Sequence, residues 1–555
     1  RFLMETSILQ VVTPELAEIV SGRAIADVAR LTASAERLTL LSRLSGGPRT
    51  HQRYHPLVRE FLEARFRSTD GAEAVANLHR RTAAAAAAWD WRIAAHHYRE
   101  AGDTSAVLQV VGDAIPTIMG NGQYALAEAF IGSIPADQRP PGFDLILSRV
   151  DMQQGDYEAA IAASQAVLES GTIDPVQRDH ALLNLVTLYL NYGDGDRALT
   201  LAEDLRGSLD PNLRSIAEVT IAILEVNTAG DVDAINRRLR VMAREQKTHR
   251  SHHFGVTLLN LAYNSISQDR LQDALAEVDG AVEAFEGASG FVELSSALVA
   301  KAQILARLGQ IAEARALIHA LMNHEAGYQY DEVYAEAADA MDAFASRDSA
   351  LAILDRVGHE STLSIAERRV LALVSARHHL RRSDFDMATS ALDGYPPGRS
   401  TVVGQPAAFE VTRAYVKVAR GDIDARKAVE HAAKQAASQG ADAMRRIGEL
   451  LRGLIDGPVA LSRSILAVGS SYPWHLTFVA DLLAPRLDSV SDEARVLVKR
   501  SAELHPERWR TELRESLAAE GGEANLAAAQ LLEDIGDDSD IPRLRLLAKS
   551  SRKTR

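Results

Sequence analysis

The sequence predicts an all-α protein built as a solenoid of stacked helical hairpins. A small residue recurs along the middle of the chain every 36 to 40 positions, at Ala159, Ala198, Ala234, Ala274, Ala314, Ala350, Ala388 and Ala425. Most of these alanines follow a turn-forming pair such as Gly155-Asp156 or Gly193-Asp194, which joins two antiparallel helices tightly. The composition, with 46% apolar but only 5% aromatic residues, favours helix over sheet.

The recurring alanine has a steric explanation. Where the second helix of a hairpin crosses the first, a large side chain would hold the two backbones apart. A single hairpin cannot bury both of its apolar stripes, so neighbouring hairpins stack and each covers the next. The expected product is a quasi-one-dimensional superhelix with a long concave wall, which is a surface suited to binding.

The charge and the missing residue types exclude several classes of function. The formal net charge is −14, from 61 Lys and Arg against 75 Asp and Glu, which opposes binding to nucleic-acid phosphates. The chain has no cysteine, so it has no disulfide or thiolate metal site, and we expect a reducing, cytoplasmic location. It has no apolar run of about 18 residues that would span a membrane. It starts at Arg1 without a leader sequence, so we expect it to be part of a longer protein.

The first 70 residues differ from the repeats. Short apolar helices are expected at the start, followed by a strand ending near Leu44, a break at Gly46-Gly47-Pro48 and a returning strand. A helix begins at Pro56, with Leu57, Phe61 and Leu62 on one face. Helices, a small hairpin and a closing helix predict a winged-helix-like module over residues 1–70.

The rest of the chain divides into four further segments. We expect helical hairpins over residues 71–140, the regular array over 141–457, a HEAT-like helical cap over 458–548 and a basic linker tail over 549–555. The cap is predicted from an apolar helix over residues 526–535. This helix is followed by Gly536-Asp537 and then by a proline at position 542. The tail has no apolar residue and is expected to be solvated.

The sequence shows no reaction centre. It contains no Walker loop, and its one Gly-x-Gly-x-x-Ala match, residues 193–198, falls in a predicted hairpin turn rather than after a strand. The clustered histidines, which include His96-His97 and His378-His379, lack partners at metal-ligand spacing, so we expect no metal site. We therefore expect no catalytic residue and predict that this chain is not an enzyme.

One aromatic cluster has two interpretations that the sequence leaves open. It consists of Phe254, Tyr263, Tyr328, Tyr330 and Tyr334. These side chains either line a ligand groove on the concave wall or pack between helices of the array.

Three N-terminal segments resemble a known family. They are Phe2-Leu3-Met4-Glu5-Thr6-Ser7-Ile8-Leu9, the block Arg53-Tyr54-His55-Pro56-Leu57-Val58-Arg59-Glu60-Phe61-Leu62, and Leu78-His79-Arg80-Arg81. In this order they resemble the motifs of MalT-like regulators, a branch of the large LuxR family that belongs to the signal-transducing ATPases with numerous domains (STAND). The resemblance implies a right-handed, tetratricopeptide (TPR)-like superhelix as the sensor, and an ATPase and a DNA-binding domain outside this chain.

The resemblance also implies a function. This chain is expected to be the sensor region of an ATP-dependent transcription regulator, in which a small inducer or a protein partner binds the superhelix. The signal would pass to the nucleotide switch, whose cofactor is ATP or ADP, and to DNA through a domain outside this chain. His55 matches the histidine that contacts the ADP diphosphate in related winged-helix modules; the alternative is that His55 caps or packs at its helix start. The alternative function is a TPR-type scaffold for protein–protein interaction, without a nucleotide switch.

Overall fold

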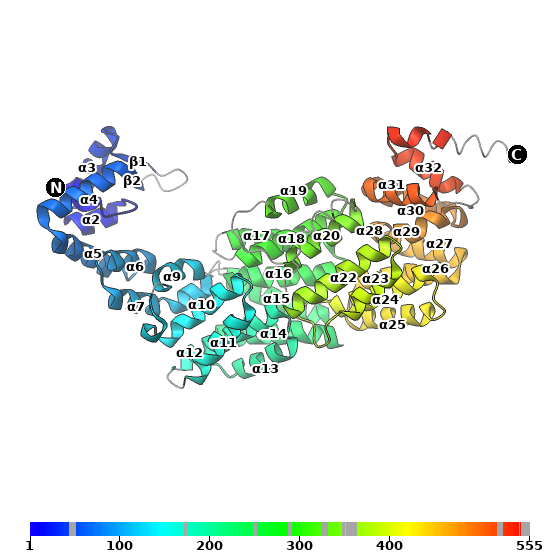
Figure 1. Ribbon diagram of the computed structural model, residues 1–555, viewed down its shortest axis with the longest axis horizontal. Helices are drawn as coiled ribbons and strands as arrows, with labels where there is room; N and C mark the ends of the chain where they lie inside the picture. The colour runs from blue at the N-terminus through cyan, green and yellow to red at the C-terminus, as the bar shows by residue number, and fades with distance from the viewer. Residues whose placement is uncertain are drawn as a thin grey trace. The chain divides into compact units, whose positions relative to one another are not determined.

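The computed structural model describes residues 1–43, 51–121, 123–132, 134–170, 173, 175–229, 231–247, 252–286, 291–322, 331–346, 350, 363–518, 525–542 and 544–545. Within these ranges the chain is helical apart from one pair of short strands, so the all-α prediction is confirmed. It divides into two compact units, Arg1–Val150 and Asp151–Arg555 (Figure 1). No helix in these ranges is long and apolar enough to cross a bilayer.

The first unit begins with a small module of helices around a two-stranded sheet. Its elements are α1 (Phe2–Thr6), α2 (Pro14–Ser21), α3 (Ile25–Arg37), β1 (Leu41–Arg43), β2 (Gln52–Tyr54) and α4 (Pro56–Asp70). The strands are antiparallel, with Leu41 opposite Tyr54, and a bridge from Val12 to Gln52 ties the α1–α2 segment to them. Their buried side chains form one core with those of the helices, as expected for a winged-helix-like module.

The apolar side chains of α4 divide between two environments. Phe66 is buried, and Val58 and Leu62 pack against the core of the module. Leu57 and Phe61 instead are 69% and 67% exposed. Of the predicted apolar face Leu57, Phe61 and Leu62, only Leu62 therefore faces the core, and Leu57 and Phe61 lie at the surface.

The remainder of the first unit is helical. Its elements are α5 (Ala72–Ala86), α6 (Trp91–Glu100), α7 (Thr104–Asp113), α8 (Ile115–Asn121), α9 (Tyr124–Ile131), the 3-10 turn Ala136–Gln138 and α10 (Pro141–Gln153), within which the boundary between the units falls. Helices α5 and α6 pack against each other. Between them, the buried imidazoles of His79 and His97 meet with their Nδ1 atoms 2.9 Å apart.

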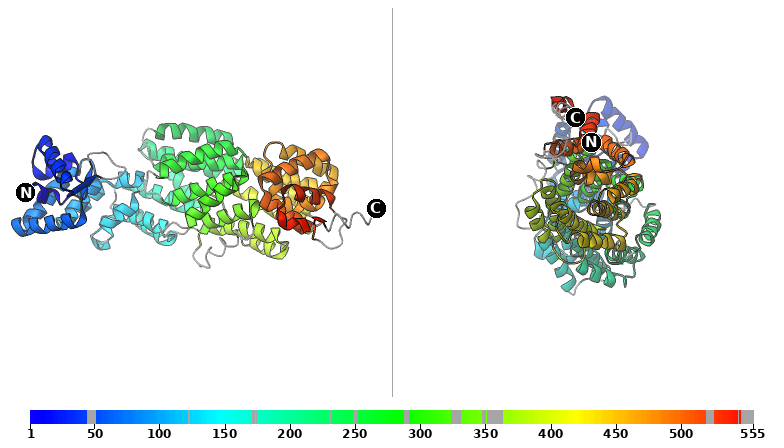
Figure 2. Two further views of the ribbon diagram at one scale, coloured as in Figure 1. Left: turned by 90° about the horizontal axis from the view of Figure 1, so that it is seen from above. Right: turned by 90° about the vertical axis from the view of Figure 1, so that its right-hand side faces the viewer.

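The second unit is an array of helical hairpins. The first helices of the pairs are α12 (Pro175–Tyr192), α14 (Pro211–Ala229), α16 (His252–Ser267), α18 (Phe291–Arg307), α20 (Asp331–Phe344), α22 (Ile365–Arg381), α24 (Gln405–Arg420) and α26 (Asp442–Asp456). The second helices are α11 (Tyr157–Glu169), which precedes α12, and then α13 (Gly195–Leu205), α15 (Val232–Lys247), α17 (Leu271–Glu286), α19 (Ile311–Met322), α23 (Phe385–Asp393), α25 (Ala425–Ser438) and α27 (Pro458–Gly469). Figure 2 shows these pairs stacked side by side.

A set of shorter helices follows the last pair. They are α28 (Trp474–Phe478), α29 (Ala480–Leu483), the 3-10 turn Ala484–Ser489, α30 (Asp492–Leu504), α31 (Pro506–Ser516), α32 (Leu526–Ile535) and the 3-10 turn Asp538–Asp540. Helix α28 contacts α20 and α26, so this C-terminal set packs against the array.

A hairpin turn ends one helix and caps the N-terminus of the next. At Gly193, φ is +90°, a conformation that glycine adopts without strain, and both Gly193 and Asp194 donate backbone hydrogen bonds to the Tyr189 carbonyl. The Asp194 side chain then accepts a hydrogen bond from the Arg197 backbone and caps α13. Asp269 and Ser383 occupy the left-handed position in two other turns, so the motif does not depend on glycine alone.

The predicted small contact position is present, although not at every alanine that the spacing selects. Ala198, Ala274, Ala314, Ala350 and Ala388 are fully buried. Ala159 is exposed, and its neighbour Ala160 is buried in its place. Interval counting alone cannot fix the helical phase to one residue, because successive residues point 100° apart around a helix.

Hairpins that are five units apart also touch. Helix α12 contacts α22, and α16 contacts α26. The turn at Gly193 lies so close to α22 that a Cβ atom built on Gly193 would stand 2.4 Å from the Ala366 nitrogen. Farther along, the His505 imidazole lies 2.8 Å from the Ala306 carbonyl. The array therefore winds far enough for successive turns of the superhelix to be in contact.

Candidate ligand cavity

A cavity of about 160 Å³ lies inside the second unit, on the side formed by the first helices of the hairpins. Its wall receives side chains from α16, α18, α20, α22, α24, α26 and α28. No second helix contributes a described residue to it. The first helices thus face the interior of the superhelix, and the alternation of the two helices decides which side chains can meet a ligand.

Apolar side chains form most of the wall, and several polar side chains complete it. The apolar part includes Trp474, Phe478, Leu373 and Val374. The polar part includes Ser267, Gln303, Arg307, Glu336, Asp339 and Arg377. A largely apolar hollow with a few converging polar groups is the common form of a small-molecule site.

Arg307 is the cation of this wall that lacks a carboxylate partner. Its guanidinium carbon stands 4.9 Å from the centre of the Trp474 ring, a cation–π contact. No described carboxylate lies within ion-pair distance of it, and its buried Nη1 has no hydrogen-bond partner among the described groups. Burial lowers the pKa of Arg307 from its ordinary value, while Asp269 and Asp339 act in the opposite direction. The cavity wall therefore holds a charge that the described protein does not neutralise by a direct pair.

Glu336 is the titratable acid of the wall. Burial, and secondarily the negative charge of Asp339, raises the pKa of Glu336 to about 7, against the opposing effects of Arg307 and Gln303. This carboxyl is therefore poised between its two protonation states near neutral pH. Such a group in a cavity is a marker of a functional site as well as of a structural ion cluster.

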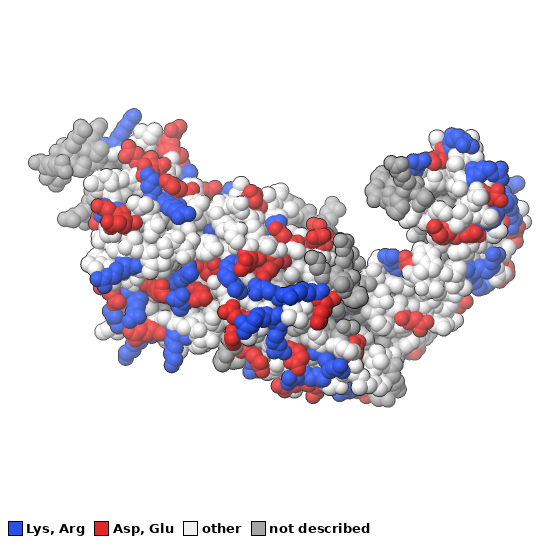
Figure 3. Space-filling view, turned by 180° about the vertical axis from the view of Figure 1, so that it is seen from behind, with Lys and Arg blue, Asp and Glu red and all other residues white. Residues whose placement is uncertain are grey.

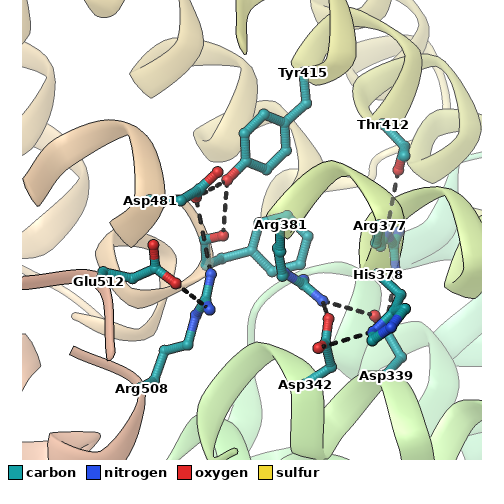
Figure 4. Close-up of polar contacts among 11 residues, drawn as sticks. Asp339, Asp342, Arg377, His378, Arg381, Thr412, Tyr415, Asp481, Arg508 and Glu512 are labelled. Carbon is teal, nitrogen blue, oxygen red and sulfur yellow. Dashed lines mark hydrogen bonds and ion pairs between the residues drawn. The ribbon is translucent and has the colours of Figure 1, made fainter. Parts of the chain in front are cut away.

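A buried ionic network begins at the cavity wall and continues away from it (Figure 4). Arg377 donates to Asp339 at 2.6 Å and to the Thr412 hydroxyl at 3.1 Å. Behind them, Asp342 pairs with Arg381 and lies 3.2 Å from the His378 Nδ1. The Arg381 guanidinium, followed by the hydrogen bond with His378, lowers the pKa of Asp342 well below its usual range despite burial. These pairs connect α20 to α22.

The network then reaches the C-terminal helices. Arg508 in α31 pairs with Glu512 and approaches Asp481, to which the Tyr415 hydroxyl donates (Figure 4). The guanidiniums of Arg377 and Arg381 lie 5.5 and 5.2 Å from the centre of the Phe478 ring. The charges of this network are thus paired near one aromatic ring, whereas Arg307 on the cavity wall has no ion pair to a described carboxylate and, unlike the buried Arg369, has an Nη1 without a hydrogen-bond partner.

The turn between α16 and α17 fixes helix α28 to the array. Asp269, in the left-handed position of the α16–α17 turn, is fully buried. It accepts a hydrogen bond from the Trp474 indole at 3.0 Å and pairs with Arg446 at 2.9 Å, and the His475 Nε2 lies 3.2 Å away. This anchoring holds Trp474 in the cavity wall next to Arg307.

The loop 394–404, which we call the strap, joins α23 to α24 and closes part of the cavity. Its last residues, Val402, Val403 and Gly404, belong to the wall. Arg369 in α22 is 2% exposed and holds the strap by donating to the carbonyls of Pro396 at 3.2 Å, Pro397 at 2.7 Å and Arg399 at 3.1 Å. The same guanidinium donates to the Gly193 carbonyl at 2.9 Å, so it joins the strap to the neighbouring superhelical turn.

The aromatic residues predicted for a groove have different places. Tyr263 lies in the cavity wall. Phe254 and Tyr334 are half-buried, and Tyr334 packs against the core of the array, but neither belongs to the described wall. Tyr328 and Tyr330 lie outside the described residues.

His55 lies at the start of α4 and is exposed. Its side chain makes no capping hydrogen bond to the helix, and its backbone nitrogen donates to the Leu40 carbonyl at 3.3 Å. Together with the exposed Leu57 and Phe61, it forms a polar and apolar surface at the amino end of α4.

Sequence reasoning did not single out Arg307, Glu336, Asp339 and Arg377. The signal was weak, because these residues lie on first helices of the hairpins but α20 and α22 each carry several other charged residues. Which helix of the hairpin faces inward had to be known before that signal could be interpreted.

Other functional chemistry is not evident in the described ranges. They contain no group of three or more His, Asp or Glu side chains placed to hold a metal ion. On the surface shown in Figure 3, basic and acidic side chains are interspersed over the larger unit rather than gathered into a basic patch. A single-sign basic surface, as nucleic-acid binding requires, is therefore not present on that face.

Comparisons with known proteins identify the N-terminal part. Residues 1–74 match the family described as the MalT winged helix domain. A search of solved structures finds a STAND protein with a tetratricopeptide repeat sensor from Pyrococcus horikoshii, at 10% identity and a TM-score of 0.35. The alignment covers 82% of this chain and 64% of that chain, so this chain spans less than two thirds of its length. A search of curated proteins finds no match. The resemblance to MalT-like regulators is confirmed by the family match, and residues 1–74 form a winged helix domain of the MalT type.

Proposed function

We propose that this chain is the sensor region of a MalT-like, ATP-dependent transcription regulator. An inducer binds inside the superhelix of the second unit and changes how the winged helix domain contacts a nucleotide-binding domain outside this chain. The cofactor, ATP or ADP, and the DNA-binding function belong to such outside domains. In this proposal the chain itself catalyses no reaction.

One combination of features supports the proposal most directly. A MalT-type winged helix domain occurs in the same chain as an array of hairpins whose first helices surround a cavity. A scaffold that only docks peptides needs a long groove, whereas a small, mostly apolar hollow with a few polar groups suits a small molecule. The cavity therefore favours a small inducer over a protein partner.

The surface at the start of α4 supports a contact with another domain. Exposed Leu57 and Phe61 stand beside His55, whose imidazole is not used for capping. Exposed apolar side chains that are close together commonly mark an interaction site. We propose that His55 donates a hydrogen bond to a phosphate oxygen of ADP bound in that domain, an interaction that the phosphate charge strengthens.

The switch requires a difference in affinity. A ligand that binds the resting and the active state with equal affinity does not shift the equilibrium between them, however tightly it binds. The strap and Trp474 meet at the cavity and are fixed to distant parts of the array, so a ligand that moves either one changes contacts elsewhere.

Native mass spectrometry of the chain purified from its own host tests the sensor proposal. We expect a bound small molecule that is released on unfolding. Ala340→Phe, which fills the cavity, should remove it, whereas Ala437→Phe on the exposed side of α25 should not. Protein partners that bind both variants equally, with no small molecule in the wild type, would favour the scaffold instead.

A separate experiment tests the role of His55. In the parent protein with its nucleotide-binding domain, His55→Ala should speed ADP release and raise basal activity, since one phosphate contact is lost. His51→Ala, a change outside the α4 motif, is the matched control. Unchanged ADP release in His55→Ala would refute the assignment.

A further inference from the structure

We propose that the cavity takes a small organic monocarboxylate, with the carboxylate bound by Arg307 and the apolar body held against Trp474 and Phe478. This inference rests on the proposed function, because it names the ligand class of the sensor cavity.

The unpaired guanidinium indicates an anion. Arg377, in the same wall, is paired with Asp339 at 2.6 Å, and Arg381 behind it is paired with Asp342. Arg307 has no such partner among the described residues, although its Nη1 is buried. Asp269, Asp339 and Glu336 act on the charge of Arg307, but none of them accepts a hydrogen bond from its buried Nη1, and a buried donor without an acceptor costs free energy. A bound anion supplies the missing partner.

The neighbouring acids restrict the charge of that anion. Glu336 and Asp339 stand in the same wall, and both act on the Arg307 guanidinium. A dianion such as a phosphate ester would be repelled by both, whereas a monocarboxylate brings one charge and two oxygens. The planar fork of a guanidinium matches a carboxylate in bidentate geometry.

The volume and the walls restrict the body of the ligand. The hollow measures about 160 Å³, close to the ~150 Å³ apolar cavity that accommodates benzene in another protein. Trp474, Phe478, Leu373 and Val374 supply apolar contact. The ligand is thus a short branched or aromatic acid, of roughly six to ten non-hydrogen atoms.

Isothermal titration calorimetry of the 555-residue chain tests this with benzoate and 4-methylpentanoate as probes. Benzamide, which has nearly the same shape without the charge, is the matched control ligand. We expect both acids to bind and benzamide to bind about 10- to 100-fold more weakly, which is the usual effect of losing a hydrogen-bonded charge. Equal binding of benzoate and benzamide, or no binding of either acid at millimolar concentration, would overturn the inference.

Two variants assign the charge recognition to Arg307. Arg307→Gln should lower benzoate affinity by about 10- to 100-fold, whereas Arg382→Gln, at an exposed position after α22, should leave it unchanged. Arg307→Gln also removes a buried unpaired charge, so the ligand-free variant should melt at the same or a higher temperature than wild type. If Arg307→Gln unfolds the chain, Arg307 is structural and the inference fails.

Glu336 gives a second, independent readout. Its carboxyl faces Arg307 and Gln303 from α18 and Asp339 from its own helix, with Arg377 of α22 in the same wall. Ionisation of Glu336 places a negative charge beside the bound anion, so benzoate affinity should fall severalfold between pH 6 and pH 8. Glu336→Gln should bind benzoate equally at both values. A pH dependence that survives this change would exclude Glu336 as its source and contradict the placement of the carboxylate.

The outcomes separate this inference from the function on which it rests. A neutral small molecule found by native mass spectrometry and displaced by Ala340→Phe would keep the sensor proposal and overturn the carboxylate assignment. Benzoate binding that Ala340→Phe does not affect would place the acid outside the cavity and refute the inference.

Discussion

Arg369 offers the sharpest test of how the superhelix is held closed. Its guanidinium donates to four backbone carbonyls, three in the strap and one at Gly193. Arg369→Met keeps much of the side-chain length and removes all four hydrogen bonds. We expect the strap to open far more often, while the helices on either side remain folded.

The expected free-energy change follows from the hydrogen bonds that the substitution removes. A hydrogen bond to a charged group contributes about 1.5–3 kcal/mol. The three strap carbonyls regain water when the strap opens, so the four bonds do not add, and we take a total near 3 kcal/mol. A change of that size raises the open fraction of the strap by about 100- to 200-fold.

Limited trypsin digestion measures this opening at one peptide bond. The strap contains Arg399, and cleavage after it reports the open fraction when closing is faster than cutting. Arg368→Met is the matched control, because Arg368 is the exposed neighbour on the same helix. A cut after Arg399 at the wild-type rate in Arg369→Met would refute the view that these hydrogen bonds hold the strap.

Three further changes test other parts of the structure. Gly193→Ala should destabilise the second unit by about 2–4 kcal/mol in urea unfolding because its Cβ would meet α22, whereas Gly155→Ala, with nothing within 4 Å, should cost only about 1 kcal/mol. Asp342→Asn leaves the buried Arg381 guanidinium with only the longer pair to Asp339, at 3.5 Å, so we expect a loss of about 3 kcal/mol by the same measurement. Burial lowers the pKa of His79 to about 4 and of His97 to about 3. Below about pH 6.5 the unfolded state therefore binds more protons, and the first unit should lose stability from there down to about pH 3; His79→Leu combined with His97→Leu should flatten this dependence in pH-dependent melting.

The hairpin array could be predicted from the sequence because it depends on short-range rules. Glycine or aspartate pairs end one helix and cap the next, and a small residue follows near a constant distance. The phase of that residue could not be read to one position, as exposed Ala159 beside buried Ala160 shows. Spacing locates a turn, whereas burial depends on the rotation of each helix against its neighbours.

The cavity could not be predicted for a different reason. Its wall combines Tyr263, Arg307, Glu336 and Trp474, which lie far apart in the sequence. Of these, the sequence indicated only Tyr263, which belongs to an aromatic cluster within the hairpin array, whereas a lone arginine in a helix usually lies at the surface. Arg307 stands out only once the structure shows that the neighbouring Arg377 and Arg381 are ion-paired.

The contacts between hairpins that are five units apart have a consequence for how the array unfolds. In a linear stack, the repeats at one end can unfold while those at the other end stay folded, because each repeat contacts only its two neighbours. Here α12 touches α22 and α16 touches α26, so melting of one hairpin weakens a distant one as well as the two adjacent ones. The second unit should therefore unfold in one cooperative transition, and a ligand that stabilises one turn of the superhelix should also stabilise the next turn.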